Sequence, residues 1–294
     1  MRAETMIYDT FPLFNELELL EIRLHELDPV VDRFVIAEAP RTHSNQPKPL
    51  HFAENRERFQ RFLPKITHIV ADDLPDSSDA WVLEGAQRRA VDRGLTECQP
   101  DDIILHSDLD EIPSARAVRD LADAMRSRYR SSPLANAWHA LLRQRAVIWA
   151  IRNAYKRRHP FVWLLEQRMH YYFLNCVSVN KPVWLGTRAT FFRDYTSAFD
   201  LRRWGGRLVP DAGWHFSYMG GVERVRQKLA AFAHQEYNHP EFTDPQHIEA
   251  ALESGRWILG DDHVLEFVPL DATFPTFIRE DPGRFRDWIR TRPT

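Results

Sequence analysis

The sequence predicts an α/β fold with a mostly parallel central sheet flanked by helices. Two observations predict this class. Through the first hundred residues, short apolar runs alternate with stretches in which apolar residues recur every three or four positions. The fourth short run, residues 102–106, is continuously apolar in its middle, as expected of a strand that is covered on both faces. Strands that alternate with helices in this way form parallel sheets with helices packed against them.

The strands and helices expected before residue 107 follow from these apolar runs and from the spacing of three or four residues between apolar side chains. In the first helix, Leu17, Leu20, Leu24 and Leu27 are spaced by three and four residues. Pro64 ends the second helix. The expected strands are residues 6–8, 34–37, 66–70 and 102–106, and the expected helices are residues 17–27, 52–63 and 81–95.

Beyond Pro113 the order of elements is less regular. The sequence predicts helices over residues 115–125 and 222–233, and mainly strands over residues 137–149, 161–179 and 183–192. A glycine-rich stretch lies between residues 205 and 221. The simplest organisation is one domain over residues 1–240, with a helical C-terminal extension over residues 241–294 packed on it.

Composition excludes several classes of protein. The formal net charge of −3 and the interspersed charges give no positive field for nucleic acid. No apolar run reaches 18 residues, and the N-terminus lacks the apolar region of a signal peptide, so we expect no transmembrane segment. Two cysteines without metal-ligand spacing fit a reducing compartment. We therefore expect a cytoplasmic protein.

The run Ser107–Pro113 is the most informative segment for function. It follows the fourth strand, and ligands of open α/β sheets lie at the carboxyl ends of strands. Asp108 and Asp110 are two residues apart, so both carboxylates can face one site. Such a pair suits Mg²⁺ or Mn²⁺ shared with the diphosphate of a sugar nucleotide. The alternative is a solvated turn or a cap for the following helix.

A second segment, residues 211–221, surrounds His215, which could complete the metal shell as a neutral imidazole. Trp214 and Tyr218 could stack on sugar faces, although core packing explains such aromatic residues equally well. Residues 202–207, with Arg207 at their end, resemble a mobile basic loop that could close over the diphosphate, or an ordinary surface loop.

Further donor-binding candidates lie at other strand ends and on one helix. Arg88 lies on the helix before the motif strand, and Glu38 ends the second strand. The complete set of predicted donor-binding residues is Asn15, Glu16, Glu38, Arg88, Asp108, Arg207 and Trp214, and the predicted metal ligands are Asp108, Asp110 and His215.

Taken together, these segments resemble the family-17 glycosyltransferases, whose animal members are N-acetylglucosaminyltransferases. The matching stretches occur in the same order along the chain, at residues 14–24, 31–38, 48–50, 87–89, 107–113, 212–218 and 220–221. The resemblance implies a GT-A fold, UDP-GlcNAc as the donor, a divalent metal, Mn²⁺ or Mg²⁺, and inversion at the anomeric carbon. Because the animal members carry a membrane anchor that this sequence does not show, we expect a hydroxyl of another carbohydrate or of a glycolipid, and not an N-glycan, as the acceptor.

An inverting transfer needs a general base that activates the acceptor hydroxyl. The candidates are Asp211, Glu223 and Glu236, with Asp211 first because it precedes the segment around His215. Two other functions remain open. In a haloacid-dehalogenase-like phosphatase, Asp108 would be the nucleophile and residues 260–262 a later metal motif. A non-catalytic carbohydrate-binding protein is the third possibility.

Overall fold

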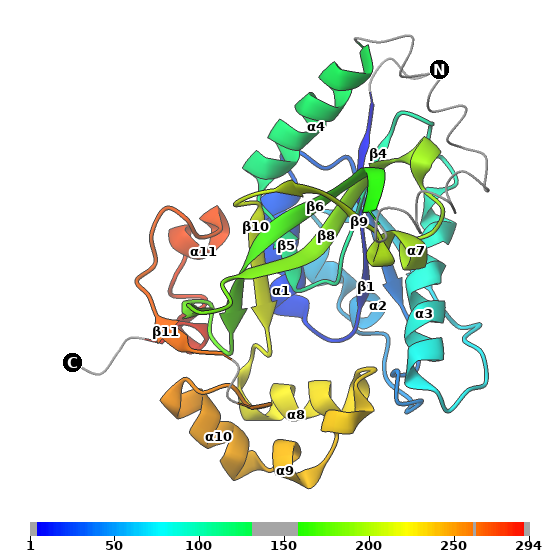
Figure 1. Cartoon of the computed structure of the whole chain (residues 1–294). Helices are drawn as coiled ribbons and strands as arrows, with labels where there is room; N and C mark the ends of the chain where they lie inside the picture. Colours follow the sequence, from blue (N-terminus) through cyan, green and yellow to red (C-terminus); the bar gives the residue numbers. More distant parts are fainter. Residues whose placement is uncertain (1–4, 131–157, 261–262, 291–294) are drawn as a thin grey trace.

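The computed structural model describes residues 5–130, 158–260 and 263–290, and these residues form one eleven-stranded sheet with helices on both faces (Figure 1). The main path of the sheet has the strand order β11-β7-β6-β8-β4-β1-β2-β3. The expected α/β class with a central sheet is therefore confirmed. The predicted strand at residues 137–149 and most of the predicted motif at residues 260–262 lie outside the described residues.

The first four strands are parallel, as the sequence predicts. They are β1 (Ile7–Leu13), β2 (Arg33–Glu38), β3 (Ile66–Val70) and β4 (Ile103–His106). β1 lies between β2 and β4, and β3 follows on the far side of β2. Their carboxyl ends consequently share one edge of the sheet.

Alternating side chains bury both faces of this parallel part. On β2, Phe34 and Ile36 pack with α1 (Leu17–Leu27) and α4 (Ala115–Arg130). Val35 and Ala37 face the other way, toward α3 (Ala80–Ala90) and α7 (Ala198–Arg203). Because neighbouring residues of a strand point to opposite faces, one short apolar run supplies both cores.

The remaining strands make the other part of the sheet mixed. β8 (Val183–Phe191) is antiparallel to β4, and β6 (Arg158–Tyr171) is antiparallel to β8. β9 (Gly205–Val209) and β10 (Gly213–Ser217) are parallel to β6, whereas β5 (Glu111–Pro113) is antiparallel to β10. β7 (Cys176–Ser178) and β11 (Leu265–Phe267) complete the edge in antiparallel pairs. The parallel arrangement thus holds for the first four strands.

Two predicted elements are wrong in detail. The helix expected at residues 52–63 ends at Glu54, because the Asn55 side chain donates a hydrogen bond to the carbonyl of His51 and its backbone leaves the helical region. The basic loop expected at residues 202–207 is instead the end of α7 and the start of β9. Gly206 is needed in β9, since a Cβ there would meet the Val162 carbonyl at 2.2 Å.

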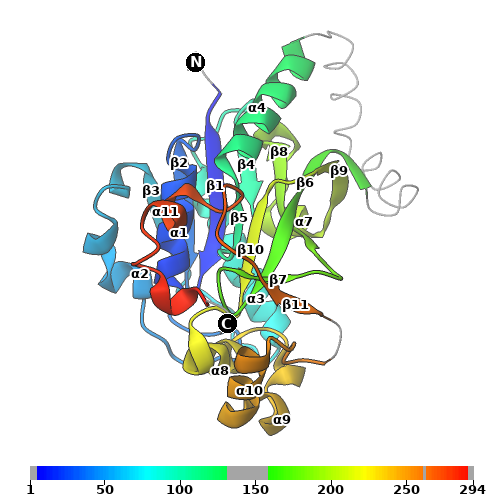
Figure 2. The ribbon, with the colours of Figure 1, turned by 90° about the vertical axis from the view of Figure 1, so that its left-hand side faces the viewer.

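Helices α8 (Gly221–Ala231), α9 (Pro240–Thr243) and α10 (Pro245–Ser254) lie together below the sheet, at the end of β1 away from its N-terminus (Figures 1 and 2). Gly220 and Gly221, with φ of 94° and 81°, form the turn from β10 into α8. The other elements are α2 (His51–Glu54), α11 (Thr276–Glu280) and 3₁₀ turns at Arg56–Phe59, Leu63–Lys65, Val91–Leu95, Phe192–Asp194, Gln235–Tyr237 and Arg286–Trp288.

The chain after residue 240 both packs on this body and enters the sheet. Ile248 of α10 shares an apolar cluster with Val225 of α8 and Met169 of β6, and β11 pairs with β7. The division at residue 240 stays a prediction. In the described part of the chain, no helix is both long and apolar enough to cross a bilayer.

Candidate active site

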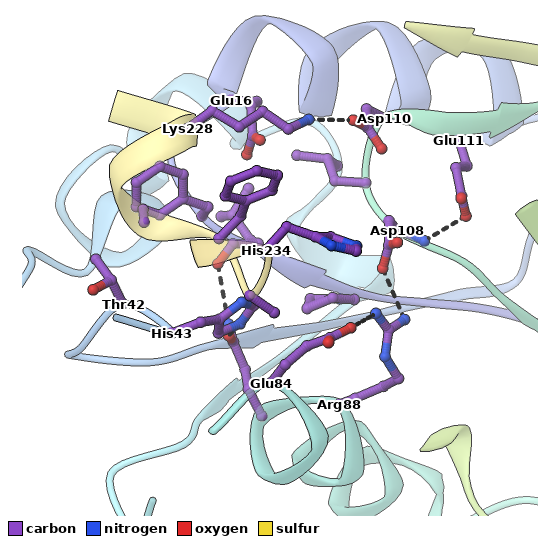
Figure 3. Close-up of a pocket in the computed structure, with 18 of the residues that line it drawn as sticks. Glu16, Thr42, His43, Glu84, Arg88, Asp108, Asp110, Glu111, Lys228 and His234 are labelled. Atoms are coloured by element: carbon purple, nitrogen blue, oxygen red, sulfur yellow. Dashed lines mark hydrogen bonds and ion pairs between the residues drawn. The ribbon is translucent and has the colours of Figure 1, made fainter. Parts of the chain in front are cut away.

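A cavity of about 740 Å³ opens at the carboxyl ends of the parallel strands, beside α8, which carries Lys228 (Figure 3). Its walls come from both parts of the sheet and from the helices around them. Five of the predicted site residues line it, namely Glu16, Arg88, Asp108, Asp110 and His215, and Tyr218 lines it as well. This is the edge at which open α/β sheets bind their ligands, and its volume is that of a small-molecule site.

The backbone of the acidic motif is held from behind by Arg23 of α1. This fully buried guanidinium forms a salt bridge with Asp9 of β1, with 2.6 Å between Nη2 and Oδ1. Its Nη1 donates to the carbonyls of Asp108, Leu109 and Glu111 at 3.0 to 3.1 Å. These three hydrogen bonds fix the backbone of the turn, because its carbonyls point toward Arg23. The side chains of Asp108, Asp110 and Glu111 line the cavity.

Asp108 lies between two arginines. Its Oδ1 is 2.7 Å from Nη1 of Arg88, and its Oδ2 is 2.9 Å from Nη2 of Arg202. Burial by itself would raise the pKa of Asp108, but Arg202 and Arg88 outweigh burial and hold this pKa well below its usual value. Asp108 is therefore a carboxylate whose two oxygens are both paired with protein cations.

Asp110 has a different environment. Its Oδ2 accepts a hydrogen bond from Nζ of Lys228 at 2.6 Å, and its Oδ1 lies 3.5 Å from Nε2 of His215. Burial would raise the pKa of Asp110, but the Lys228 ammonium, followed by His215, holds this pKa well below its usual value. One oxygen thus carries a salt bridge while the other faces an imidazole.

Glu111 and Arg202 form the back wall of the cavity. Arg202 Nη2 lies 2.5 Å from Glu111 Oε1, and Arg202 Nη1 donates to Glu111 Oε2 and to the Gly186 carbonyl. Trp184 Nε1 donates to Glu111 Oε1 at 2.5 Å. A Cβ on Gly186 would lie 2.3 Å from the Glu111 carboxyl carbon, so this network requires glycine there.

The residues present fit a divalent metal that is shared with a phosphate ligand. In the described ranges no group of three or more His, Cys, Asp or Glu side chains is placed to hold a metal by itself. The pair Asp110 and His215 offers one carboxylate oxygen and one imidazole nitrogen on the same wall. Mg²⁺ and Mn²⁺ sites of this kind use one or two protein ligands and fill the other positions with substrate phosphates and water. Asp108 is less suited, since both its oxygens are paired with arginines.

Several predicted donor-binding residues lie outside the cavity wall. The Trp214 indole points into the core and donates to the carbonyl of Thr273. Neighbouring residues of a strand point to opposite faces, and the next residue of β10, His215, points to the cavity. Glu38 is fully buried and accepts hydrogen bonds from Phe52 and His68. Arg207 lies over the ring of Trp163 on β6, and Asn15 contacts Gln227 and Arg224 of α8.

The three predicted general bases are on the surface and do not line the cavity. The side chain of Asp211 is 89% exposed and pairs with Arg116, that of Glu223 is 67% exposed, and that of Glu236 is 58% exposed. Asp211 occupies a turn with φ of 48°, where the chain enters β10. Its proximity to His215 in sequence therefore does not bring it to the site.

Sequence reasoning missed other members of the wall. Lys228 and Trp184 contact the motif carboxylates, and Glu84 pairs with Arg88. An aromatic wall of the same cavity consists of Phe14, His43, Trp81, Phe199, Phe232 and His234. The only sequence signal for Glu84 is its spacing of four residues from Arg88. Lys228 and Trp184 have no such signal, since only the fold brings them to the motif.

The fold and this cavity define the class as an α/β protein with a small-molecule cavity at the carboxyl ends of its parallel strands. Residues 1–126 match the family model described as glycosyltransferase family 17. The β-1,4-mannosyl-glycoprotein 4-β-N-acetylglucosaminyltransferases of Rattus norvegicus and Homo sapiens are each 23% identical to this chain over 92% of its length. The chain spans 52% of the length of these relatives.

The resemblance to the family-17 glycosyltransferases is therefore confirmed, and the family model covers the acidic motif with Arg23 and Arg88. Among solved structures, the glucosyl-3-phosphoglycerate synthase of Mycobacterium tuberculosis, in complex with Mn²⁺ and UDP-glucose, aligns over 94% of this chain and 92% of its own. That alignment has 14% identity and a TM-score of 0.35, too low to establish a common fold.

Proposed function

We propose that this protein is a metal-dependent inverting glycosyltransferase that moves a sugar from a nucleoside diphosphate to a hydroxyl of a glycan or glycolipid. The observation that carries the proposal is the convergence of Asp108 and Asp110 on one cavity at the carboxyl ends of parallel strands. The match to a glycosyltransferase family supports it. UDP-GlcNAc is the proposed donor, supported by the names of the relatives.

In this proposal, Asp110 Oδ1 and His215 Nε2 hold Mn²⁺ or Mg²⁺. Such an ion would stabilise the negative charge that builds up on the leaving diphosphate as the sugar departs. The fixed backbone of the motif keeps Asp110 in place, because Arg23 holds the residues on both sides of it. The aromatic wall supplies flat apolar faces for the nucleobase and sugars, and it helps exclude water.

The general base must be a carboxylate that reaches the cavity and is not already held by a cation. Among the described cavity residues, Glu16 is the carboxylate without a hydrogen bond or salt bridge to a cationic side chain; its Oε2 accepts from the Asn15 N–H at 3.1 Å. Glu84, Asp108, Asp110 and Glu111 are each paired with a lysine or arginine. We therefore assign proton abstraction to Glu16 in place of the surface carboxylates.

The two alternatives are less well supported. A phosphatase would need Asp108 as a free nucleophile, whereas both its oxygens are paired with arginines. A purely carbohydrate-binding protein would not need the paired acidic and basic groups beside the aromatic wall. A reducing, cytoplasmic location remains our proposal, supported by the two free and buried cysteines, Cys98 and Cys176.

The test is to incubate the protein with Mn²⁺ and a panel of nucleotide sugars, and separately with a generic phosphomonoester. The proposal expects release of UDP from UDP-GlcNAc, increased by an added glycan acceptor and abolished by chelation of the metal. Release of inorganic phosphate from the phosphomonoester would support the phosphatase instead. Binding of glycans without turnover of any donor would support the carbohydrate-binding protein.

A further inference from the structure

The cations around the cavity differ in how many of their hydrogen-bond donors are already used. Arg88 contacts Asp108, Glu84 and His106. Arg202 contacts Asp108, Glu111 and the carbonyl of Gly186. Each of these two guanidinium groups thus already binds two carboxylates and one further acceptor, so its charge is balanced within the protein.

Lys48 is also committed, because its ammonium lies 3.1 Å from the carbonyl of Pro49, 3.5 Å from that of Phe14 and 3.6 Å from Glu38. Arg203 lies at the exposed rim, with its guanidinium over the ring of Phe199. Neither residue presents spare donors to the two motif carboxylates.

Lys228 is different. Its ammonium has three N–H donors, and in the described part of the chain the one hydrogen bond that it donates goes to Oδ2 of Asp110. Its side chain is 24% exposed, and its Nζ lies 5.3 Å from the centre of the Tyr218 ring. Figure 3 shows the side chain extending from α8 along the cavity to Asp110. Two donors therefore remain beside a carboxylate whose other oxygen faces His215.

We propose that Lys228 binds the diphosphate of the donor directly, while keeping its salt bridge to Oδ2 of Asp110. The two oxygens of Asp110 then serve different groups: Oδ1, with His215, is free for the metal, and Oδ2 orients the ammonium. The spare N–H groups of Lys228 donate to phosphate oxygens, with the charge assistance that makes such bonds strong. Lys228 is thus a diphosphate-binding residue that neither the acidic motif nor the family match identifies.

The charges around the site favour this role. The Lys228 ammonium is positively charged at neutral pH and lies 2.6 Å from Oδ2 of Asp110. A diphosphate brings at least two negative charges into a wall that already contains Asp108, Asp110 and Glu111. Arg88 and Arg202 each bind two carboxylates, whereas Lys228 is the described cation that binds Asp110 alone and keeps two donors for the ligand.

This inference rests on the proposed function, and its test uses binding as well as turnover. The variants are Lys228→Met, which keeps the length of the side chain, and Lys228→Arg, which keeps its charge. Arg226→Met on the same helix is the matched control, since Arg226 is paired with Glu223 outside the cavity. Calorimetry measures binding of Mn²⁺ alone, and then of inorganic pyrophosphate and UDP in the presence of Mn²⁺.

Lys228→Met is expected to weaken binding of pyrophosphate and of UDP at least tenfold, with no loss of affinity for Mn²⁺ alone. Lys228→Arg is expected to restore part of that loss, and Arg226→Met to bind like the unchanged protein. Affinity for pyrophosphate within twofold of the unchanged protein in Lys228→Met would overturn the inference. If Lys228→Met does not fold, Lys228→Gln, which removes the charge but keeps a polar side chain, takes its place: binding of pyrophosphate at least tenfold weaker supports the inference, and affinity within twofold of the unchanged protein contradicts it.

The inference and the proposed function can fail separately. Lys228-dependent binding of pyrophosphate without turnover of any nucleotide sugar would leave the inference standing and remove the proposed function. Turnover of UDP-GlcNAc, together with unchanged affinity for pyrophosphate in Lys228→Met, would leave the proposed function standing and remove the inference about Lys228.

Discussion

The two parts of the sheet contribute different groups to the site. The parallel part, β1 to β4 with the turn that follows, supplies the carboxylates of Asp108 and Asp110. The mixed part and the helices attached to it supply Arg202, His215 and Lys228, which contact those carboxylates. The acidic motif is therefore only half of the site, and its chemistry depends on cations that enter about 90 to 120 residues later in the chain.

The largest effect on stability is expected from cutting the link between the two parts. Arg202→Met removes the guanidinium that joins Asp108 and Glu111, and it leaves the 1% exposed Glu111 without a cationic partner. Loss of one partner from a buried ion pair costs about 3 kcal/mol, so we expect the free energy of unfolding to fall by about that amount. Chemical denaturation at pH 7 measures it.

The matched control is Arg203→Met, the next residue of the same helix. Arg203 is exposed and lies over the ring of Phe199, so its loss should change the free energy of unfolding by about 0.5 kcal/mol or less. Equal losses in the two variants would show that Arg202 does not join the two parts of the sheet.

A second test compares a cavity carboxylate with a surface one. Glu16→Gln keeps the shape of the side chain but removes the proton acceptor, so we expect kcat to fall by about 100-fold. Asp211→Asn should leave kcat unchanged, because that side chain is 89% exposed and outside the cavity. Steady-state kinetics with UDP-GlcNAc and an acceptor measure both variants. A fall in kcat in Asp211→Asn, with no fall in Glu16→Gln, would identify Asp211 as the general base, as the sequence analysis first predicted.

A smaller effect concerns pH and the mixed part of the sheet. His170 of β6 is fully buried, and burial, followed by Arg168, lowers the pKa of this residue to about 3. The unfolded chain binds a proton at His170 below about pH 6.5, whereas the folded chain resists it. Stability from this group is therefore present above pH 6.5 and is lost as the pH falls toward 3.

Between pH 7 and pH 5.5 this loss amounts to about 1 kcal/mol. Phenylalanine keeps the aromatic packing of His170 against Phe216 and Phe274 but does not titrate. We expect the pH dependence of the unfolding free energy to be smaller by about 1 kcal/mol in His170→Phe. The same pH dependence in both proteins would show that His170 binds its proton equally well in the folded and the unfolded chain.

The same division of the sheet explains what could be predicted from the sequence. The parallel part was largely predictable, because each strand is a short apolar run and each helix repeats its apolar residues every three or four positions. The acidic motif was located for the same reason, since it directly follows a buried strand. The mixed part was not, because glycine in β9 and β10 reflects close approach of strands, and single-sequence patterns interpret it as loop.

Pairing across the site was the least predictable feature. His215 was identified by its residue type and its small neighbours, and the structure places it 3.5 Å from Asp110. Lys228 looks like any other lysine of a helix, and only the turn at Gly220 and Gly221 brings it to the motif. Asp211 was overvalued because it is near His215 in sequence, although the turn with positive φ directs it to solvent.

The most direct test of the central claim is metal-dependent binding of UDP, measured by calorimetry in the unchanged protein and in Asp110→Asn. The substitution preserves the size of the side chain but removes the charge that His215 and Lys228 face. The account predicts that Mn²⁺ strengthens UDP binding in the unchanged protein and has no effect in Asp110→Asn. Equal enhancement by Mn²⁺ in both proteins would contradict it.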